Sequence, residues 1–374
     1  MNGTAPSPVP TLNTTTPRIF IAATRQNEGK TTISLGLLAA LQQFYPRIGY
    51  IKPVGQRFVE IEEQKIDEDT VLMDQVYRLN CPLVDMSPIA VEPDFTRKYL
   101  QHSNNEALVK KIVKAFDRVA WEKDFVLCEG SGHAGVGSVF DLSNAQVDKI
   151  VGAKVVIVSQ GGIGKPIDEV YLNQAVFERE GVEIIGVILN KVTDDKLDYV
   201  TEFARRGFKR KGLELLGVLP HRPILSRPTF GAIQEELHAR QINSWNGSNN
   251  LVENVFIGAK SVQNTVGHFK SGTLVITPGD RDDIIEAAAV TAHEPGRQLA
   301  GMVLTEKLTP TDGLLRVVEN AAFPILVSDE DSYEVTSRVH NIIVKTRAAD
   351  TEKISIIRDI IAANVDVNKI LRAL

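Results

Sequence analysis

The chain has 374 residues, of which 43% are hydrophobic, so it is long enough for two domains with full cores. Its net charge of −5 leaves no basic excess to neutralise phosphate backbones, so we expect no nucleic-acid binding. No apolar run reaches the roughly 18–20 residues that span a bilayer, and two cysteines make no disulfide framework. We therefore expect a cytoplasmic protein with no membrane partner.

Residues 1–17 are rich in Thr, Pro, Ser and Asn. They contain neither the charged start nor the apolar core of a signal peptide. We predict a disordered N-terminal tail.

The next segment, Arg18–Thr32, predicts a buried strand, a tight loop and a helix that opens on Gly29-Lys30-Thr31-Thr32. This is the end of a phosphate-binding loop. Its backbone N–H groups would face a phosphate, Lys30 would reach the outer phosphates, and the Thr31 hydroxyl would touch Mg²⁺. The standard pattern has Gly where this chain has Thr24.

Residues 18–240 alternate short β-branched runs with amphipathic helices, which predicts a parallel α/β sheet covered on both faces. The expected strands are 19–23, 48–51, 125–128, 155–159, 184–189 and 215–219, and the expected helices include 31–43, 105–121 and 168–180. Ligands of such sheets bind at the carboxyl ends of the strands.

Three further strand ends carry polar residues that could join the loop, namely Lys52, Glu129 and Asn190. The acidic segment Asp67-Glu68-Asp69 starts a helix and could supply another Mg²⁺ ligand. Alternatives stay open at each position. Lys52 could be a solvated strand end, Glu129 a helix cap or ion-pair partner, and the aspartates a solvated helix start that favours the helix dipole.

Three other segments invite a functional interpretation that we do not favour. His133 is a lone histidine in a glycine-rich connection. The run Gly161–Pro166 resembles a second phosphate loop, but Pro suits the first turn of a helix, which favours a plain strand-to-helix turn. The basic run Arg205–Lys211 is expected to be a solvated helix end.

The composition shifts to Asn, Ser and Gly near residue 241, which predicts a linker over residues 241–252. A second alternating series follows, with expected strands 255–259, 273–277, 301–305 and 324–328 and a last helix near 352–363. We predict a smaller α/β domain over residues 253–374.

The phosphate loop, strand-end lysine and strand-end glutamate, in this order, resemble the dethiobiotin synthetase family. That family's loop reads G-T-D-T-x-x-G-K-T, so Thr24 fits it, whereas Ala23, Arg25 and the pair Asn27-Glu28 depart from it. Its K-P-V and V-E-G-A-G-G segments match residues 52–54 and 128–133.

The resemblance implies a P-loop NTPase-like fold that binds ATP and Mg²⁺ at a homodimer-associated site. The family's metal-binding Asp matches Asp69 best, with Asp67 as the alternative, and its adenine-contacting Asn matches Asn190. In that family ATP activates a carbamate on a diamine, and a cyclic urea closes. Residues 55–57 and the loop 132–144 differ from the family, so another small-molecule substrate is expected.

The segment Phe269–Ile284 resembles the DRTGG domain, a sensing or assembly module. A synthetase-like domain followed by DRTGG resembles the N-terminal regulatory region of long phosphate acetyltransferases. This resemblance covers residues 18–344, and no acetyltransferase domain is expected in this chain. For Asp280 and Arg281, a strand-end salt bridge and a ligand contact are equally good interpretations.

Three hypotheses follow. The first is a stand-alone nucleotide-dependent regulator or an ATP-dependent ligase-like ATPase, and the second is a non-catalytic allosteric partner of a separate acetyltransferase. The third, a cobyrinate-type amide synthase, ranks last because the second half has no cysteine for a glutaminase. The expected site residues are Lys30 and Lys52 for catalysis, Asn27, Glu28, Gly29, Lys30, Thr31, Thr32 and Asn190 for the nucleotide, and Thr31, Asp69 and Glu129 for the metal.

Overall fold

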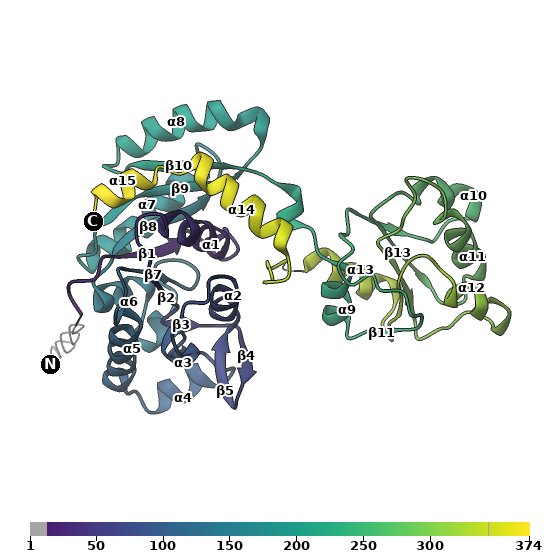
Figure 1. Cartoon of the computed structure of the whole chain (residues 1–374), viewed down its shortest axis with the longest axis horizontal. Helices are drawn as coiled ribbons and strands as arrows, with labels where there is room; N and C mark the ends of the chain where they lie inside the picture. The colour runs from purple at the N-terminus through teal and green to yellow at the C-terminus, as the bar shows by residue number, and fades with distance from the viewer. Residues whose placement is uncertain (1–12, 343) are drawn as a thin grey trace. The chain divides into compact units, whose positions relative to one another are not determined.

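A computed structural model describes residues 13–342 and 344–374. The chain divides into two compact units (Figure 1). The first unit contains the residues up to His221 together with Thr346–Leu374, and the second unit is Arg222–Lys345. The second unit is therefore an insertion between two parts of the first.

The first unit is built on a six-stranded sheet with the order β10-β9-β8-β1-β7-β2, and all its strand pairs are parallel. The strands are β1 (Arg18–Ala23), β2 (Ile48–Ile51), β7 (Phe125–Glu129), β8 (Lys154–Gln160), β9 (Ile184–Val192) and β10 (Leu215–Pro220). Nearly all their residues are buried, as expected of a sheet covered on both faces. The predicted α/β parallel-sheet fold is confirmed.

Strand β1 lies at the place where the order of the sheet reverses. After β1 the chain forms β2 and then β7 between them on one side, and it then continues with β8, β9 and β10 on the other side. In open α/β sheets, such a switch point leaves a crevice at the carboxyl ends of the strands. The loop after β1 opens there.

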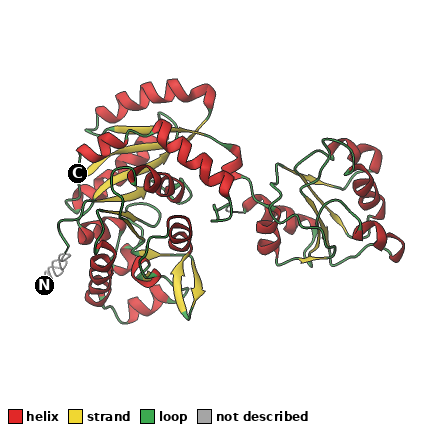
Figure 2. Ribbon diagram, in the orientation of Figure 1, coloured by secondary structure: helices red, strands yellow, loops and turns green. Residues whose placement is uncertain are grey.

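Helices alternate with these strands (Figure 2), and several of them are amphipathic. In α5, for example, Ile112, Phe116 and Val119 recur at helical spacing and are fully buried. The helices are α1 (Lys30–Leu41), α5 (Asn105–Ala120), α6 (Asn144–Val151), α7 (Lys165–Arg179) and α8 (Leu197–Lys209).

Between β2 and α5 the chain adds small elements that the sequence pattern did not predict. They are β3 (Val54–Gly55), β4 (Phe58–Ile61), β5 (Gln64–Asp67), α2 (Glu68–Tyr77), α3 (Leu83–Met86), β6 (Ile89–Ala90) and α4 (Phe95–Gln101). Strands β4 and β5 form an antiparallel hairpin that ends at Asp67, directly before α2. The hairpin thus places the acidic start of α2 next to Lys52, which follows β2.

The C-terminal helices α14 (Thr351–Asn364) and α15 (Val367–Arg372) belong to the first unit, where α14 lies against α1 (Figure 1). Their contacts are close. A Cβ on Gly36 of α1 would lie 2.3 Å from Cγ1 of Ile361, and the amide of Asp366 donates to the carbonyl of Leu216 in β10 at 2.8 Å. The second domain was expected to extend to residue 374, but in the structure the second unit ends at Lys345.

The second unit holds a five-stranded sheet with the order β11-β15-β14-β13-β12, parallel except for β11 at one edge. One face packs on α9 and α13 through residues such as Phe230 and Val335, and the other on α11 and α12 through residues such as Ile285 and Val318. The elements are α9 (Phe230–Leu237), β11 (Arg240–Gln241), β12 (Asn254–Ile257), α10 (Val262–Thr265), β13 (Thr273–Pro278), α11 (Asp282–Thr291), β14 (Gly301–Thr305), α12 (Leu315–Glu319), β15 (Ile325–Val327) and α13 (Ser332–Asn341).

The segment expected as a linker, residues 241–252, is folded into this second unit. Asn243 donates to the carbonyl of Phe323 at 2.9 Å and accepts from the amide of Ile325 at 3.0 Å. A Cβ on Gly247 would lie 2.7 Å from the ring of Pro324. The Asn and Gly residues thus build internal turns, and the units join at residues 221–222 and 345–346 instead.

The expected disordered tail, residues 1–17, lies in part outside the described residues. Its described end is held in place, because the Arg18 guanidinium donates to the carbonyls of Asn13 and Thr16 at 2.7 and 2.8 Å. In the described part of the chain, no helix has the length and apolar character that a membrane span requires. Cys81 and Cys128 are both free thiols.

Candidate nucleotide site

The loop between β1 and α1 has the backbone of an anion-binding turn. Asn27 and Gly29 adopt left-handed conformations, with φ of 62° and 99°. The positive φ favours Gly at position 29, and a Cβ there would lie 2.2 Å from the side-chain nitrogen Nδ2 of Asn190. No side chain caps the N-terminus of α1, and its first turn has no acidic residue. Its N–H groups and dipole therefore suit an anion.

Side chains from neighbouring strands hold this loop. Asn190 Nδ2, at the end of β9, donates to the carbonyl of Glu28 at 2.8 Å, and Lys191 Nζ donates to the carbonyl of Asn27 at 2.8 Å. The Thr24 hydroxyl lies 3.1 Å from the hydroxyl of Ser159 in β8. Asn190 thus supports the loop, and its contact with a nucleobase stays a prediction.

Lys30 is the first residue of α1, and its side chain is buried next to several charges. Burial lowers the pKa of Lys30 to about 8, and the charges of Glu129 and Asp69 oppose this shift. A buried ammonium at a helix N-terminus is costly without an anionic partner. Lys30 is therefore placed where a phosphate would compensate its charge.

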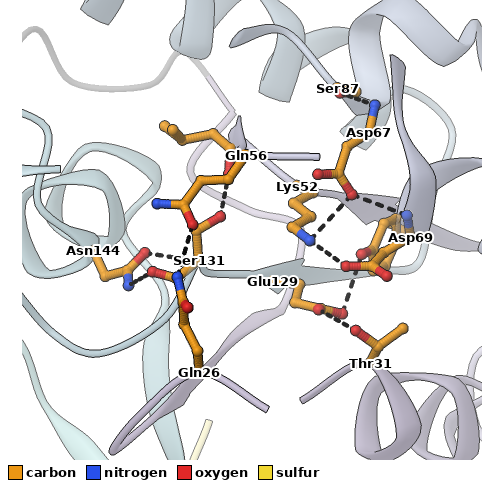
Figure 3. Close-up of polar contacts among 12 residues, drawn as sticks. Gln26, Thr31, Lys52, Gln56, Asp67, Asp69, Ser87, Glu129, Ser131 and Asn144 are labelled. Carbon is orange, nitrogen blue, oxygen red and sulfur yellow. Dashed lines mark hydrogen bonds and ion pairs between the residues drawn. The ribbon is translucent and has the colours of Figure 1, made fainter. Parts of the chain in front are cut away.

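Glu129, at the end of β7, is fully buried and accepts hydrogen bonds from two sides (Figure 3). The Thr31 hydroxyl donates to its Oε1 at 3.0 Å, and the Tyr50 hydroxyl donates to its Oε2 at 3.1 Å. Burial raises the pKa of Glu129, although the positive charge of Lys52 opposes the shift. The structure thus joins Thr31 and Glu129, which the sequence predicted separately.

Tyr50 is a site residue that the sequence analysis missed. A signal was available, because Tyr50 and Lys52 are two residues apart at the end of one strand and so point to the same face. A tyrosine in an otherwise aliphatic buried strand also needs a partner for its hydroxyl.

Lys52, directly after β2, forms a buried cluster with the start of α2 (Figure 3). Its Nζ lies 3.1 Å from Oδ1 of Asp67 and forms a second, shorter ion pair with Oδ2 of Asp69. Burial alone would lower the pKa of Lys52, but Asp69, Asp67 and Glu129 outweigh it and raise the pKa, so Lys52 stays protonated. Neither Lys52 nor the aspartates are solvated, although the aspartates do lie at the start of α2 as the alternative interpretation had it.

The two aspartates have different tasks. Asp67 Oδ1 accepts from the amide of Asp69 at 2.9 Å and so caps α2, while Asp67 Oδ2 is enclosed so tightly that a Cβ on Gly55 would lie 2.6 Å from it. Asp69 is committed to Lys52 through its carboxylate. That Asp69 binds a metal, with Asp67 as the alternative, stays a prediction.

The donor set fits Mg²⁺ when phosphate oxygens complete it. Three carboxyl groups and two amino groups share the cluster, namely Asp67, Asp69, Glu129, Lys30 and Lys52. Mg²⁺ in proteins is commonly held by one or two carboxylates plus substrate phosphates. Within the described residues, no three His, Cys, Asp or Glu side chains are arranged to hold a metal by themselves.

Two family models match this chain. The model described as "AAA domain" matches residues 17–229, more than half of the chain, and the model described as "DRTGG domain" matches residues 232–342. The chain belongs to the AAA domain family. The expected order of a P-loop domain followed by a DRTGG domain, as in phosphate acetyltransferases, is confirmed.

Curated relatives of this AAA–DRTGG chain include two phosphate acetyltransferases. That of Pseudomonas putida is 30% identical over 358 residues, which cover 93% of this chain and 50% of the relative. That of Pseudomonas aeruginosa is 28% identical over 364 residues, with the same coverage. The chain spans about half the length of these relatives.

Solved structures show weaker likenesses. The MinC:MinD cell division complex of Aquifex aeolicus matches with a TM-score of 0.36 and 15% identity, covering 56% of this chain and 83% of that one. The CBS and DRTGG domains of a Clostridium perfringens pyrophosphatase match with a TM-score of 0.26 and 13% identity, covering 46% and 85%. Scores this low support no conclusion about ligands.

The glycine-rich loop after β7 of the AAA domain is firmly fixed. Asn144 Nδ2 donates to the carbonyls of Ser131 and His133 at 2.7 and 2.6 Å, and its Oδ1 accepts from the amide of Ser131 at 3.0 Å. Gln26 of the phosphate loop reaches Gln56 after β3 at 3.0 Å. The glycine-rich loop after β7 is therefore not merely a flexible connection. The His133 side chain in this loop is exposed.

The remaining segments singled out from the sequence lie at the ends of helices. Gly161–Pro166 leads from β8 into α7 with Pro in the first turn, as a plain strand-to-helix turn would. Arg205–Lys211 is mostly exposed at the end of α8. In the DRTGG domain, Arg281 forms its salt bridge with Asp283, at 2.8 Å, and not with Asp280.

Proposed function

We propose that the AAA domain binds Mg-ATP in the β1–α1 loop, as a nucleotide-dependent regulator or a ligase-like ATPase. The backbone of Asn27–Gly29 and the N-terminus of α1, with Lys30 and Thr32, would surround the phosphates. Thr31, Asp69 and Glu129 would hold the Mg²⁺, and Asn190 would support the loop and face the nucleobase. When bound, Mg²⁺ would neutralise phosphate charge.

The observation that carries the proposal is that buried Lys30 and half-buried Thr31 open an uncapped helix, and that the Thr31 hydroxyl donates to the buried Glu129. Burying an ammonium and a carboxylate is expensive, and a protein without an anionic ligand would gain nothing from the arrangement. Phosphoryl transfer needs aligned charges more than covalent chemistry, and Lys30 and Lys52 supply two cations.

The role of Lys52 differs between an ATPase and a regulator. Its ammonium is held by Asp67 and Asp69, and in catalysis it would turn toward a second substrate or the transferred phosphoryl group. A non-catalytic partner of a separate acetyltransferase is the second candidate. It is favoured by the relatives, which are named phosphate acetyltransferases and are about twice as long as this chain.

Titration calorimetry with Mg-ATP tests the binding. We expect micromolar affinity, about −8 kcal/mol, and a loss of about 100-fold in Lys30→Ala, because charge-assisted hydrogen bonds to phosphate disappear. The affinity should also fall as the pH rises through about 8, where free Lys30 loses its proton.

Lys165→Ala is the matched control, because Lys165 also opens a helix after a glycine-rich loop but is exposed. Its affinity should equal that of the wild type. Absence of ATP binding to the wild type would refute the proposal. ADP release stimulated by a diamine or carboxylic acid would favour the ATPase, and binding without such release the regulator. The expected homodimer and the second substrate stay predictions.

A further inference from the structure

Tyr50 is a fully buried tyrosine whose hydroxyl donates to Glu129. It lies in β2, which pairs in parallel with β7, and its registered partner on β7 is Leu127. Glu129 is two residues further along β7, so it shares a face of the sheet with Leu127. Tyr50 therefore reaches Glu129 diagonally across one face, at the carboxyl ends of both strands.

The Glu129 carboxylate is fixed by two hydroxyls on opposite elements. Thr31, in the first turn of α1, donates to Oε1 at 3.0 Å, while Tyr50 donates to Oε2 at 3.1 Å. With one oxygen fastened to the sheet, the other is directed at the residue that follows Lys30 (Figure 3). The Tyr50 hydroxyl thus helps to fix the orientation in which the Glu129 carboxylate meets the phosphate-loop helix.

We propose that Tyr50 is a positioning residue for the nucleotide-bound Mg²⁺, acting through Glu129. The inference rests on the proposed function, since it assigns Glu129 Oε1 and the Thr31 hydroxyl to the metal. Groups that hydrogen-bond a ligating carboxylate set its orientation, and their removal commonly costs about 10- to 100-fold in metal affinity.

A purely structural role gives a different expectation. If Tyr50 only satisfied a buried carboxylate, removing its hydroxyl would weaken the fold but leave the metal dependence of nucleotide binding unchanged. A positioning role affects binding with Mg²⁺ and spares binding without it. The contrast between the two conditions therefore distinguishes the roles.

Tyr50→Phe keeps the ring in the core and removes only the Tyr50 hydroxyl, which donates to Glu129. Calorimetry with ATP, over a series of Mg²⁺ concentrations and in excess EDTA, measures the effect on the full chain. We expect the Mg²⁺ concentration for half-maximal enhancement to rise about 10-fold or more, with unchanged affinity in EDTA. The melting temperature shows whether each variant is folded.

Tyr77→Phe is the matched control, because the Tyr77 hydroxyl also hydrogen-bonds α1, at the carbonyl of Leu35, but does not touch Glu129. It should keep the wild-type Mg²⁺ dependence. Glu129→Gln provides a second background. There, adding Tyr50→Phe should produce no further change in Mg²⁺ dependence, and an additive change would contradict the proposal.

The outcomes also separate this inference from the function on which it rests. Wild-type protein that binds no ATP would overturn both. Wild-type protein that binds Mg-ATP with the same Mg²⁺ dependence as Tyr50→Phe would overturn the role of Tyr50 alone. A raised Mg²⁺ requirement in Tyr50→Phe, but not in Tyr77→Phe, would support it.

Discussion

At the scale of single residues, Asp148 in α6 is a buried carboxyl without compensation. It is fully buried, and neither of its oxygens has a hydrogen-bond partner. Burial raises the pKa of Asp148 well above its usual value. The folded protein therefore holds a proton on Asp148 over a pH range in which the unfolded chain releases it.

This proton makes the stability depend on pH. Between the unfolded pKa, near 4, and the raised folded pKa, the folded state binds more protons, so the stability falls as the pH rises. Asp148→Asn cannot titrate and should lose this slope. The difference in free energy of unfolding between Asp148→Asn and the wild type should therefore increase by up to about 1.4 kcal/mol for each pH unit.

Urea unfolding of both proteins from pH 5 to pH 8 measures the difference. Asp359→Asn, at an exposed position in α14, is the control and should keep the wild-type slope. Parallel stability curves for wild type and Asp148→Asn would show that Asp148 finds a partner in solution.

The sequence predicted site residues where the backbone pattern determines them. Lys30 and Thr31 follow from the loop motif, and Glu129 from its place at a strand end. Tyr50 and Asp148 were not predicted. The role of Tyr50 depends on a hydrogen bond to a residue 79 positions further along the chain, and that of Asp148 on the lack of a hydrogen-bond partner for its buried carboxyl. Strand spacing gives the face of a residue but not its partner across the sheet.

At the scale of elements, the contact between α14 and α1 is unusually close. A Cβ on Gly36 would lie 2.3 Å from Cγ1 and 2.8 Å from Cβ of Ile361, and 3.1 Å from the carbonyl oxygen of Ile357. Gly36 lies in the interior of α1, where glycine costs about 1 kcal/mol relative to alanine. The close approach of α14 gives a reason for this glycine.

Gly36→Ala should therefore destabilise the protein, although alanine is the better helix former. We expect a loss of about 1–3 kcal/mol, the usual range for an overpacked contact. Urea unfolding measures it. Ile361→Ala should cost less stability in the Gly36→Ala background than in the wild type, since it removes Cγ1, the nearest atom in conflict.

Gly207→Ala in α8 is the matched control. There the added Cβ would meet only the end of the Ile167 side chain, at 2.6 Å, which can turn aside. Its stability should be unchanged or slightly increased. A Gly36→Ala variant as stable as Gly207→Ala would show that α14 does not press on α1.

The strands of the two large sheets, except β11, were predicted within a few residues, because the alternation of apolar runs and amphipathic helices is strong. The linker over residues 241–252 was misplaced for a physical reason. Asn and Gly form turns inside a domain as readily as between domains, and Asn243 uses its amide to fasten such a turn. Composition alone does not separate the two cases.

At the scale of the whole molecule, the second unit interrupts the first. The chain leaves the first unit after His221 and returns at Thr346. The pattern of residues 352–363 predicted a helix but not its partner, because an amphipathic face does not specify the surface it covers. The domain that holds the phosphate loop thus depends on residues that are more than 300 positions away in the sequence.

This architecture predicts which fragments fold. Replacing residues 222–345 by a flexible Gly/Ser linker keeps β10, α14 and α15 together, so the first unit should fold cooperatively and bind Mg-ATP as the whole chain does. A fragment of residues 1–240 lacks α14 and exposes the face of α1 around Gly36. We expect it to melt at a lower temperature and to bind ATP at least 10-fold more weakly, about 1.4 kcal/mol. Circular dichroism measures the melting temperatures of both proteins, and calorimetry measures their ATP affinities. If the two domains were arranged in series along the chain, the fragment of residues 1–240 would match the whole chain in ATP affinity, which would contradict the insertion.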